Sequence, residues 1–132
     1  HQIVWSYKVK KNCYDAHRLP NGNTLLATNK GVYEVTPDKK EVWSYDLKQT
    51  FYGIQPLPNG NILLANYSNA TVVEITREKK IVWSYKVKRP FDVFRLTNGN
   101  TLVTTYNEIL EVTPEGKRLW TRTGNSYGRA RR

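Results

Sequence analysis

The sequence of 132 residues is poor in the side chains that hold metals and cross-links. It has one cysteine, Cys13, two histidines, His1 and His17, and no methionine. A single cysteine excludes an internal disulfide framework and a cysteine-based zinc site. No apolar run approaches the ~20 residues that a membrane-spanning helix requires, and no signal peptide is visible. We therefore expect no metal, no cofactor and no membrane span. The missing methionine predicts that the chain is processed or cut from something longer.

Acidic residues are also scarce. The chain has 21 Lys and Arg against 11 Asp and Glu, a formal net charge of +10. Hydrophobic residues make up 39% and aromatic residues 12%, which is too apolar and too aromatic for a disordered basic tail. The length suits one ordinary domain. The composition thus predicts a folded, basic domain that favours anionic partners.

Three sequence markers recur in the same order about every 40 residues, the period of repeat architectures. The first marker is a tryptophan: Trp5, Trp43, Trp83 and Trp120. The second is Asn-Gly-Asn, at 21–23, 59–61 and 98–100. The third is a glutamate between apolar residues: Glu34, Glu74 and Glu111. The sequence therefore contains three copies of one unit.

Each unit is predicted to form four short strands. In the first unit these strands cover 14–19, 24–28, 32–36 and 41–45, where β-branched and aromatic residues are frequent. Asn-Gly between two apolar runs predicts a hairpin, because both residues tolerate positive φ. Four antiparallel strands in about 40 residues are typical of a β-propeller blade. We expect the repeated tryptophans to pack between blades.

The predicted fold is all-β: a propeller segment of three four-stranded blades plus one extra leading strand at 3–7. The segment covers 1–123, with repeats at about 8–45, 46–85 and 86–123. A basic flexible tail follows at 124–132. Propellers close with four to eight blades, so either two copies complete a six-bladed ring or the chain is part of a longer propeller. The homodimer is the favoured reading, because an isolated arc would expose apolar blade faces.

The repeated unit resembles the blades of PQQ-like and arylsulfotransferase-like propellers. The resemblance rests on Leu-Pro-Asn-Gly-Asn-x-Leu-Leu-Ala, followed by Val-x-Glu-Val-Thr-Pro and Trp-Ser-Tyr. It implies a propeller fold and an extracellular or periplasmic location. It also implies that a histidine at the place of His17 lines the channel. The equivalent positions here are Gln55 and Phe94, so a multi-histidine transfer site is absent from this pattern.

The candidate site lies where each fourth strand connects to the next first strand. Those connections are basic, and aromatic residues follow them. The candidate ligand-binding residues are Lys10, Lys11, Tyr14, His17, Lys48, Tyr52, Gln55, Lys88, Arg89 and Phe91. Cations beside aromatic rings suit an anionic ligand with flat or apolar parts, such as a sulfated or phosphorylated glycan. Single-stranded nucleic acid is a less favoured partner.

Three functions remain open from the sequence. The first is a non-catalytic binding module, which the lack of a catalytic constellation favours. The second is an arylsulfotransferase-like or PQQ-dependent enzyme fragment, with His17 as the one weak catalytic candidate. The third is a self-assembling repeat protein, engineered or trimmed. The repeated glutamates are expected to make structural hydrogen bonds, because buried charges must be paired.

Overall fold

A computed structural model describes residues 12–123 of the chain. These residues form three antiparallel four-stranded sheets and contain no helix. Blade 1 consists of β1 (Cys13–Arg18), β2 (Thr24–Thr28), β3 (Gly31–Val35) and β4 (Glu41–Asp46). Blade 2 consists of β5 (Phe51–Pro56), β6 (Ile62–Asn66), β7 (Thr71–Ile75) and β8 (Ile81–Lys86). Blade 3 consists of β9 (Pro90–Arg95), β10 (Thr101–Thr105), β11 (Glu108–Val112) and β12 (Arg118–Thr123).

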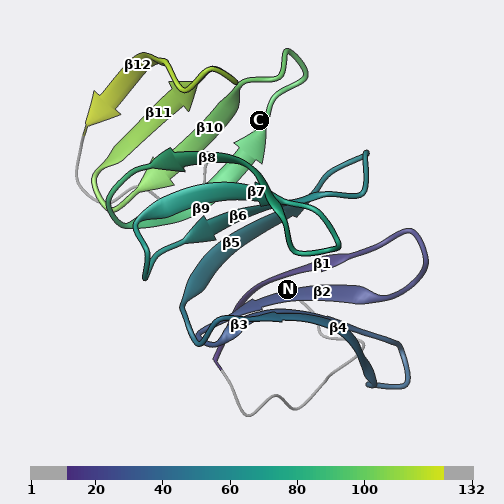
Figure 1. Cartoon of the computed structure of the whole chain (residues 1–132). Coiled ribbons are helices and arrows are strands. Elements are labelled where there is room, and N and C mark those ends of the chain that lie inside the picture. Colours follow the sequence, from purple (N-terminus) through teal and green to yellow (C-terminus); the bar gives the residue numbers. More distant parts are fainter. Residues whose placement is uncertain (1–11, 124–132) are drawn as a thin grey trace.

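In every sheet the strands pair in sequence order, so each blade is a simple meander. The blades stack one after another, with blade 2 between blades 1 and 3 (Figure 1). The first strands β1, β5 and β9 lie next to one another along the stack. This arrangement confirms the predicted all-β architecture of a partial β-propeller. The leading strand expected at 3–7, Trp5, and the tail expected at 124–132 lie outside the described residues. No helix within the described part of the chain is long and apolar enough to cross a membrane.

Two hydrophobic clusters hold the stack together, one in each junction between blades. The cluster between blades 1 and 2 includes Leu25, Val32, Tyr45, Ile54 and Leu64. The cluster between blades 2 and 3 includes Leu63, Val72, Val93, Val103 and Leu110. Neighbouring residues of β6, such as Leu63 and Leu64, enter different clusters because successive strand side chains point to opposite faces. Both faces of blade 2 are therefore buried, which explains its unbroken apolar strands.

The Asn-Gly turns connect the first and second strands of the blades as hairpins. Gly22 takes a φ of +90°, but Asn21 does not take a positive φ. Instead, the Asn21 side-chain oxygen accepts a hydrogen bond from the Asn23 amide at 2.9 Å, and Gly22 N donates to Leu19 O. The hairpin is thus a wider turn with one left-handed glycine, a common three-residue solution. The predicted hairpin is present: the glycine takes the positive φ, and the asparagine side chain stabilises the turn.

Two of the three described tryptophans pack between blades as predicted. The Trp43 indole donates to the Arg77 carbonyl of blade 2, and the Trp83 indole donates to the Pro114 carbonyl of blade 3, each at 2.8 Å. Trp120 differs, because no blade follows it among the described residues. It is 41% exposed, and its indole donates to Glu111 of its own blade at 2.9 Å. For Trp120 the expected inter-blade packing is therefore not present in the described structure.

Candidate functional site

The connections predicted to carry the site gather at one end of the blade stack. Lys48 N donates to Lys30 O, Tyr67 N to Thr50 O, and Tyr106 N to Arg89 O, at 2.8, 2.9 and 3.1 Å. These bonds join each connection between blades to a turn between second and third strands. We call this end the connection face; it is made of residues 29–30, 47–50, 67–70, 87–89 and 106–107. The hairpins between first and second and between third and fourth strands lie at the other end, the hairpin face (Figure 1).

Four aromatic side chains form a continuous cluster at the connection face. The Tyr52 ring lies 4.5 Å from the Tyr14 ring and 5.0 Å from both Tyr67 and Phe91, measured between centroids. Tyr67 and Phe91 are 5.6 Å apart. The rings come from the starts of the first strands of all three blades and from the turn after β6. All four remain half-buried, so part of each ring faces solvent.

The Tyr52 hydroxyl at the centre of this cluster stays protonated at neutral pH. Burial raises the pKa of Tyr52, and the proximity of Tyr14 and Tyr67 raises it further. A neutral phenol can both donate and accept a hydrogen bond. The cluster therefore offers apolar ring surface together with the neutral hydroxyl of Tyr52, a combination that suits flat or sugar-like ligands.

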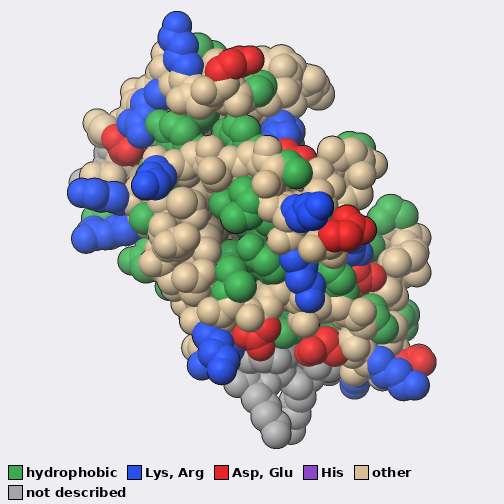
Figure 2. Space-filling view, viewed as in Figure 1, with side chains coloured by type: hydrophobic (Ala, Val, Ile, Leu, Met, Phe, Trp, Pro, Cys, Tyr) green, Lys and Arg blue, Asp and Glu red, His purple; other side chains and the backbone are tan. Residues whose placement is uncertain are grey.

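Exposed cations lie on the same connection face. Lys48 and Arg89 take left-handed backbone conformations, with φ of 57° and 51°. The Arg89 guanidinium lies 5.3 Å from the centre of the Tyr106 ring, within cation–π range. An open hollow of ≈ 680 Å³ next to them is lined by Asn69, Ala70, Thr71, Lys86, Val87 and Lys88. Figure 2 shows Lys and Arg side chains along the left edge, the side on which these connections lie in Figure 1.

His17 and Gln55 lie at the junctions between blades. His17 Nε2 is 3.4 Å from Asp15 Oδ2, and the same carboxylate oxygen accepts a hydrogen bond from Ile54 N of blade 2. The imidazole keeps 29% of its side-chain surface exposed. Gln55 Oε1 accepts a 2.6 Å hydrogen bond from Arg95 N of blade 3. Gln55 thus joins the first strands of blades 2 and 3, which gives it a structural contact.

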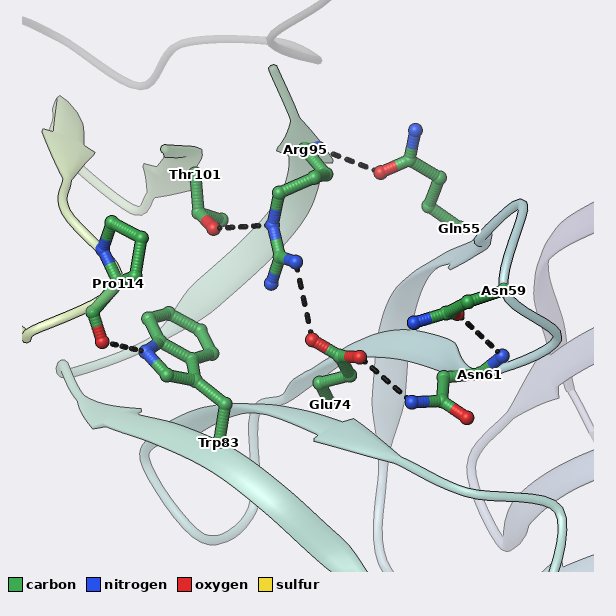
Figure 3. A network of polar contacts seen from close by, with 8 residues as sticks. All are labelled: Gln55, Asn59, Asn61, Glu74, Trp83, Arg95, Thr101 and Pro114. Atoms are coloured by element: carbon green, nitrogen blue, oxygen red, sulfur yellow. Dashed lines mark hydrogen bonds and ion pairs between the residues drawn. The ribbon is translucent and has the colours of Figure 1, made fainter. Parts of the chain in front are cut away.

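The repeated glutamates are centres of polar networks in the junctions. Glu74 accepts a 2.8 Å hydrogen bond from the Asn61 side chain and pairs with Arg95 of blade 3 at 3.1 Å (Figure 3). The Arg95 guanidinium also lies over the Trp83 ring, 5.5 Å from its centre. Each network therefore links a hairpin, a buried carboxylate and the next blade.

Glu34 makes the same kind of network with different elements. Its carboxylate accepts from the side chains of Asn21 and Asn23 and from the guanidinium of Arg77, which lies in the turn after β7. Burial alone would raise the pKa of Glu34, but the hydrogen bonds from Asn23 and Arg77 outweigh it and lower the pKa below 4.5. The expected structural hydrogen bonds are present. Their partners, the second asparagine of Asn-Gly-Asn and an arginine of the next blade, were not predicted.

The structure brings together three of the predicted site residues and adds two others. Tyr14, Tyr52 and Phe91 meet in the aromatic cluster, whereas Lys10 and Lys11 lie outside the described residues. Sequence reasoning missed Tyr67 and Tyr106, although both directly follow a second strand and so had to lie on the connection face. Among residues 12–123, no three His, Cys, Asp or Glu side chains are grouped so that they could hold a metal ion.

Comparison with known proteins shows the fold. No protein-family model and no curated protein matches the chain. A solved protein of unknown function from Bacteroides caccae is 23% identical, with a TM-score of 0.74 over 92% of this chain and 50% of that chain. A catalytically inactive virginiamycin B lyase from Staphylococcus aureus, solved with quinupristin, is 19% identical, with a TM-score of 0.65 over 84% of this chain and 41% of the lyase. The WD40 domain of Neurospora crassa Pan2 is 10% identical, with a TM-score of 0.66 over 87% of this chain and 37% of that chain. The chain spans half or less of these structures.

Proposed function

We propose that this protein is a non-catalytic binding module that holds an anionic ligand with a flat or carbohydrate part on its connection face. The observation that carries the proposal is the half-exposed cluster of Tyr14, Tyr52, Tyr67 and Phe91 on the same face as exposed Lys and Arg side chains. Aromatic rings supply contact area, and the cations supply attraction for sulfate or phosphate.

The aromatic cluster favours a specific ligand over a merely hydrated basic surface. A surface that only keeps a protein soluble has no need for four half-exposed rings in mutual contact. Arg89 is held over Tyr106, so at least one cation has a defined position. Lys88 lines the neighbouring hollow and is exposed. A sulfated or phosphorylated sugar would stack on the rings and place its anionic group near these two side chains.

The resemblance of the repeated unit to PQQ-like and arylsulfotransferase-like propellers supports the same class of ligand. Such propellers bring ligands to the face where successive blades connect, and they work outside the cytoplasm. An extracellular or periplasmic location would give the protein access to sulfated glycans. The solved neighbours show the propeller fold alone.

A second candidate function is an enzyme in which His17 moves a proton. The favouring observation is Asp15, whose Oδ2 lies 3.4 Å from His17 Nε2 and so is placed to orient the imidazole. A histidine with an orienting carboxylate is the usual form of a general base. Replacing His17 by Ala would abolish turnover of an aryl sulfate if this candidate holds; no turnover by the unmodified protein would exclude the enzyme.

The test is a titration calorimetry panel with a sulfated disaccharide, its unsulfated counterpart, a phosphorylated sugar, an aryl sulfate and a single-stranded oligonucleotide. We expect the sulfated or phosphorylated sugar to bind and the unsulfated one to bind at least tenfold more weakly. Tyr52→Ala should weaken binding roughly tenfold, since stacking on one ring contributes about 1–3 kcal/mol. Binding to the unmodified protein should weaken as the salt concentration rises. The double variant Lys88→Glu, Arg89→Glu should not bind.

A matched control comes from the hairpin face. Lys79→Glu with Lys80→Glu changes the net charge by the same amount at two exposed lysines of the turn after β7. We expect this pair to bind like the unmodified protein. Equal losses of affinity in both double variants would mean that only the total charge of the protein matters. Binding of the oligonucleotide alone would mean that the ligand is a nucleic acid and not a glycan. No binding of any probe would contradict the proposed function.

A further inference from the structure

The last described blade has a partly open face where the other blades have a neighbour. We call the face of a blade toward the following blade its trailing face and the opposite face its leading face. Val32 and Val72 on the trailing faces of blades 1 and 2 are fully buried. Their counterpart in blade 3, Ile109, is only half-buried, as is Phe94 on the same face. Blade 3 thus exposes apolar side chains that its repeat places in a junction.

A hollow on this face lies beside Glu111, the counterpart of the glutamates that pair with an arginine in the other junctions. It measures ≈ 370 Å³ and is lined by Phe94, Arg95, Leu96, Thr97, Asn98 and Glu111. In the two complete junctions the equivalent glutamates, Glu34 and Glu74, receive Arg77 and Arg95 from the following blade. Glu111, which accepts hydrogen bonds from Asn100 Nδ2 and Trp120 Nε1, is therefore the counterpart of Glu34 and Glu74 on the trailing face of blade 3.

The leading face of blade 1 presents a guanidinium. Arg18 is exposed, and its Nε donates to Thr24 Oγ1 at 3.2 Å. Arg95 has the same anchor, with Nε donating to Thr101 Oγ1 at 3.0 Å, and it reaches Glu74 from this pose. No carboxylate within residues 12–123 pairs with Arg18. Arg18 is thus held in the conformation that serves a preceding blade.

The position two residues before Arg18 also indicates that a blade is missing from the leading face of blade 1. Ile54 of blade 2 is fully buried against blade 1, and Val93 of blade 3 is fully buried against blade 2. Their counterpart Ala16 is exposed. Leu26, Tyr33 and Val35, on the same leading face, are buried. The open part of the leading face is therefore the strip along β1 that carries Ala16 and Arg18.

We propose that a second copy of this chain covers these surfaces, with β1 of each copy docked on the trailing face of blade 3 of the other. Within one chain the two surfaces lie at opposite ends of the stack, with blade 2 between them (Figure 1), so they meet only between molecules. A two-fold arrangement forms both contacts at once and closes a ring of six blades. Two copies also match the length of the Bacteroides caccae neighbour, half of which one chain covers.

The contact in this ring reproduces a junction that the chain already contains. Arg18 of the second copy takes the place relative to Glu111 and Phe94 that Arg95 takes relative to Glu74 and Gln55. Ala16 packs where Val93 packs in the junction between blades 2 and 3. Ring closure would also bring Tyr14 of each copy near the connection face of blade 3 of the other. The dimer does not depend on the proposed ligand, so each can be tested without the other.

The experiment measures the solution mass by light scattering after size exclusion, at 2 and 200 µM protein and about 0.15 M salt, which screens the charge of +10 on each copy. We expect a mass of two chains of 15.4 kDa at the higher concentration. Arg18→Glu should raise the dissociation constant at least tenfold, and Phe94→Asp by a similar factor. Lys40→Glu, the same charge change in an exposed turn of blade 1, should leave the dissociation constant unchanged.

Circular dichroism and the thermal midpoint show whether each variant is folded. Arg18 and Lys40 are both exposed, so we expect their variants to fold. A mass of one chain at 200 µM would overturn the proposal. A dimer that tolerates both Arg18→Glu and Phe94→Asp would overturn it as well, because the copies would then meet elsewhere. A mass other than two chains would exclude the six-bladed ring.

Discussion

Replacement of Arg95 by alanine is the most direct test of how the blades are held together. Arg95 links blades 2 and 3 in two ways: Nη1 pairs with Glu74 at 3.1 Å, and the guanidinium lies over the Trp83 ring. Its Nε is anchored within blade 3 by a 3.0 Å hydrogen bond to Thr101. Glu74 keeps only 10% of its side-chain surface exposed, against 23% for Arg95. The substitution therefore leaves a buried carboxylate with its asparagine partners alone.

The expected loss of unfolding free energy is about 3 kcal/mol. Removing one partner of a buried ion pair costs about 3–5 kcal/mol, and the cation–π contact adds about 0.5–1 kcal/mol. The residual exposure of Arg95 screens the pair, and Asn61 still donates to Glu74, so the lower end of that range applies. The truncated side chain also leaves Thr101 without its arginine partner.

Urea unfolding followed by tryptophan fluorescence measures this loss. Arg18→Ala is the matched control, because Arg18 has the same threonine anchor in blade 1 but no carboxylate within the described residues. At sub-micromolar protein, where chains are separate, we expect Arg18→Ala to cost about 0.5 kcal/mol. If the two variants lose equal stability, the ion pair does not hold the junction and the reasoning is wrong.

Two further predictions concern the close approach of the first strands and the carboxylates. Gly53→Ala should cost about 1–3 kcal/mol, since the new Cβ would lie 2.8 Å from Phe91 O and 2.9 Å from Asp92 Cα, backbone atoms that cannot move away; an unchanged thermal midpoint would contradict the packing of β5 on β9. Stability should also fall in acid. Burial alone would raise the pKa values of Glu34 and Glu74, but hydrogen bonds from asparagine and arginine outweigh it and lower both below 4.5. Their contribution is therefore complete above pH 4.5 and is lost as the pH falls through the lowered values. A Glu34→Gln, Glu74→Gln variant should be less sensitive between pH 5 and pH 3 in urea titrations, and equal sensitivity would exclude these groups.

The fold was predictable because the repeat is explicit in the sequence. Trp43, Glu34 and the Asn-Gly-Asn turn recur with about the same spacing. The short runs between them are rich in β-branched and aromatic residues and are bounded by turn signals, which favours strands. The strand ranges expected for the first unit agree with β1–β4 to within about one residue. Local pattern suffices where each strand is bounded by a turn that has its own sequence signal.

The partners across the junctions were not predictable from the pattern. Glu74 was expected to make a structural hydrogen bond. The identity of its charged partner, Arg95, depends on which face of β9 meets blade 2. A bulge near the start of each first strand shifts the register there, and spacing alone does not reveal it. Tyr67 joins the aromatic cluster for the same reason: it lies in a turn, and the stacking of blades, not its neighbours in sequence, brings it to Tyr52. The roles of these residues stay proposals that the binding experiments test.

The arginines of the junctions have a consequence for how such a chain can diverge. Two positions of each blade can hold the arginine of a junction: the last residue of the first strand and the second residue after the third strand. Each blade has arginine at one of these positions and proline at the other: Arg18 with Pro37, Arg77 with Pro56, and Arg95 with Pro114. Arg77 and Arg95 show that either position delivers a guanidinium to the preceding glutamate. A compensated exchange of arginine and proline is therefore a nearly neutral evolutionary path. Descendants that follow it lose aligned identity at two positions per blade while every carboxylate stays paired. Relatives of such a protein would be recognisable by shape long after their sequences had ceased to align.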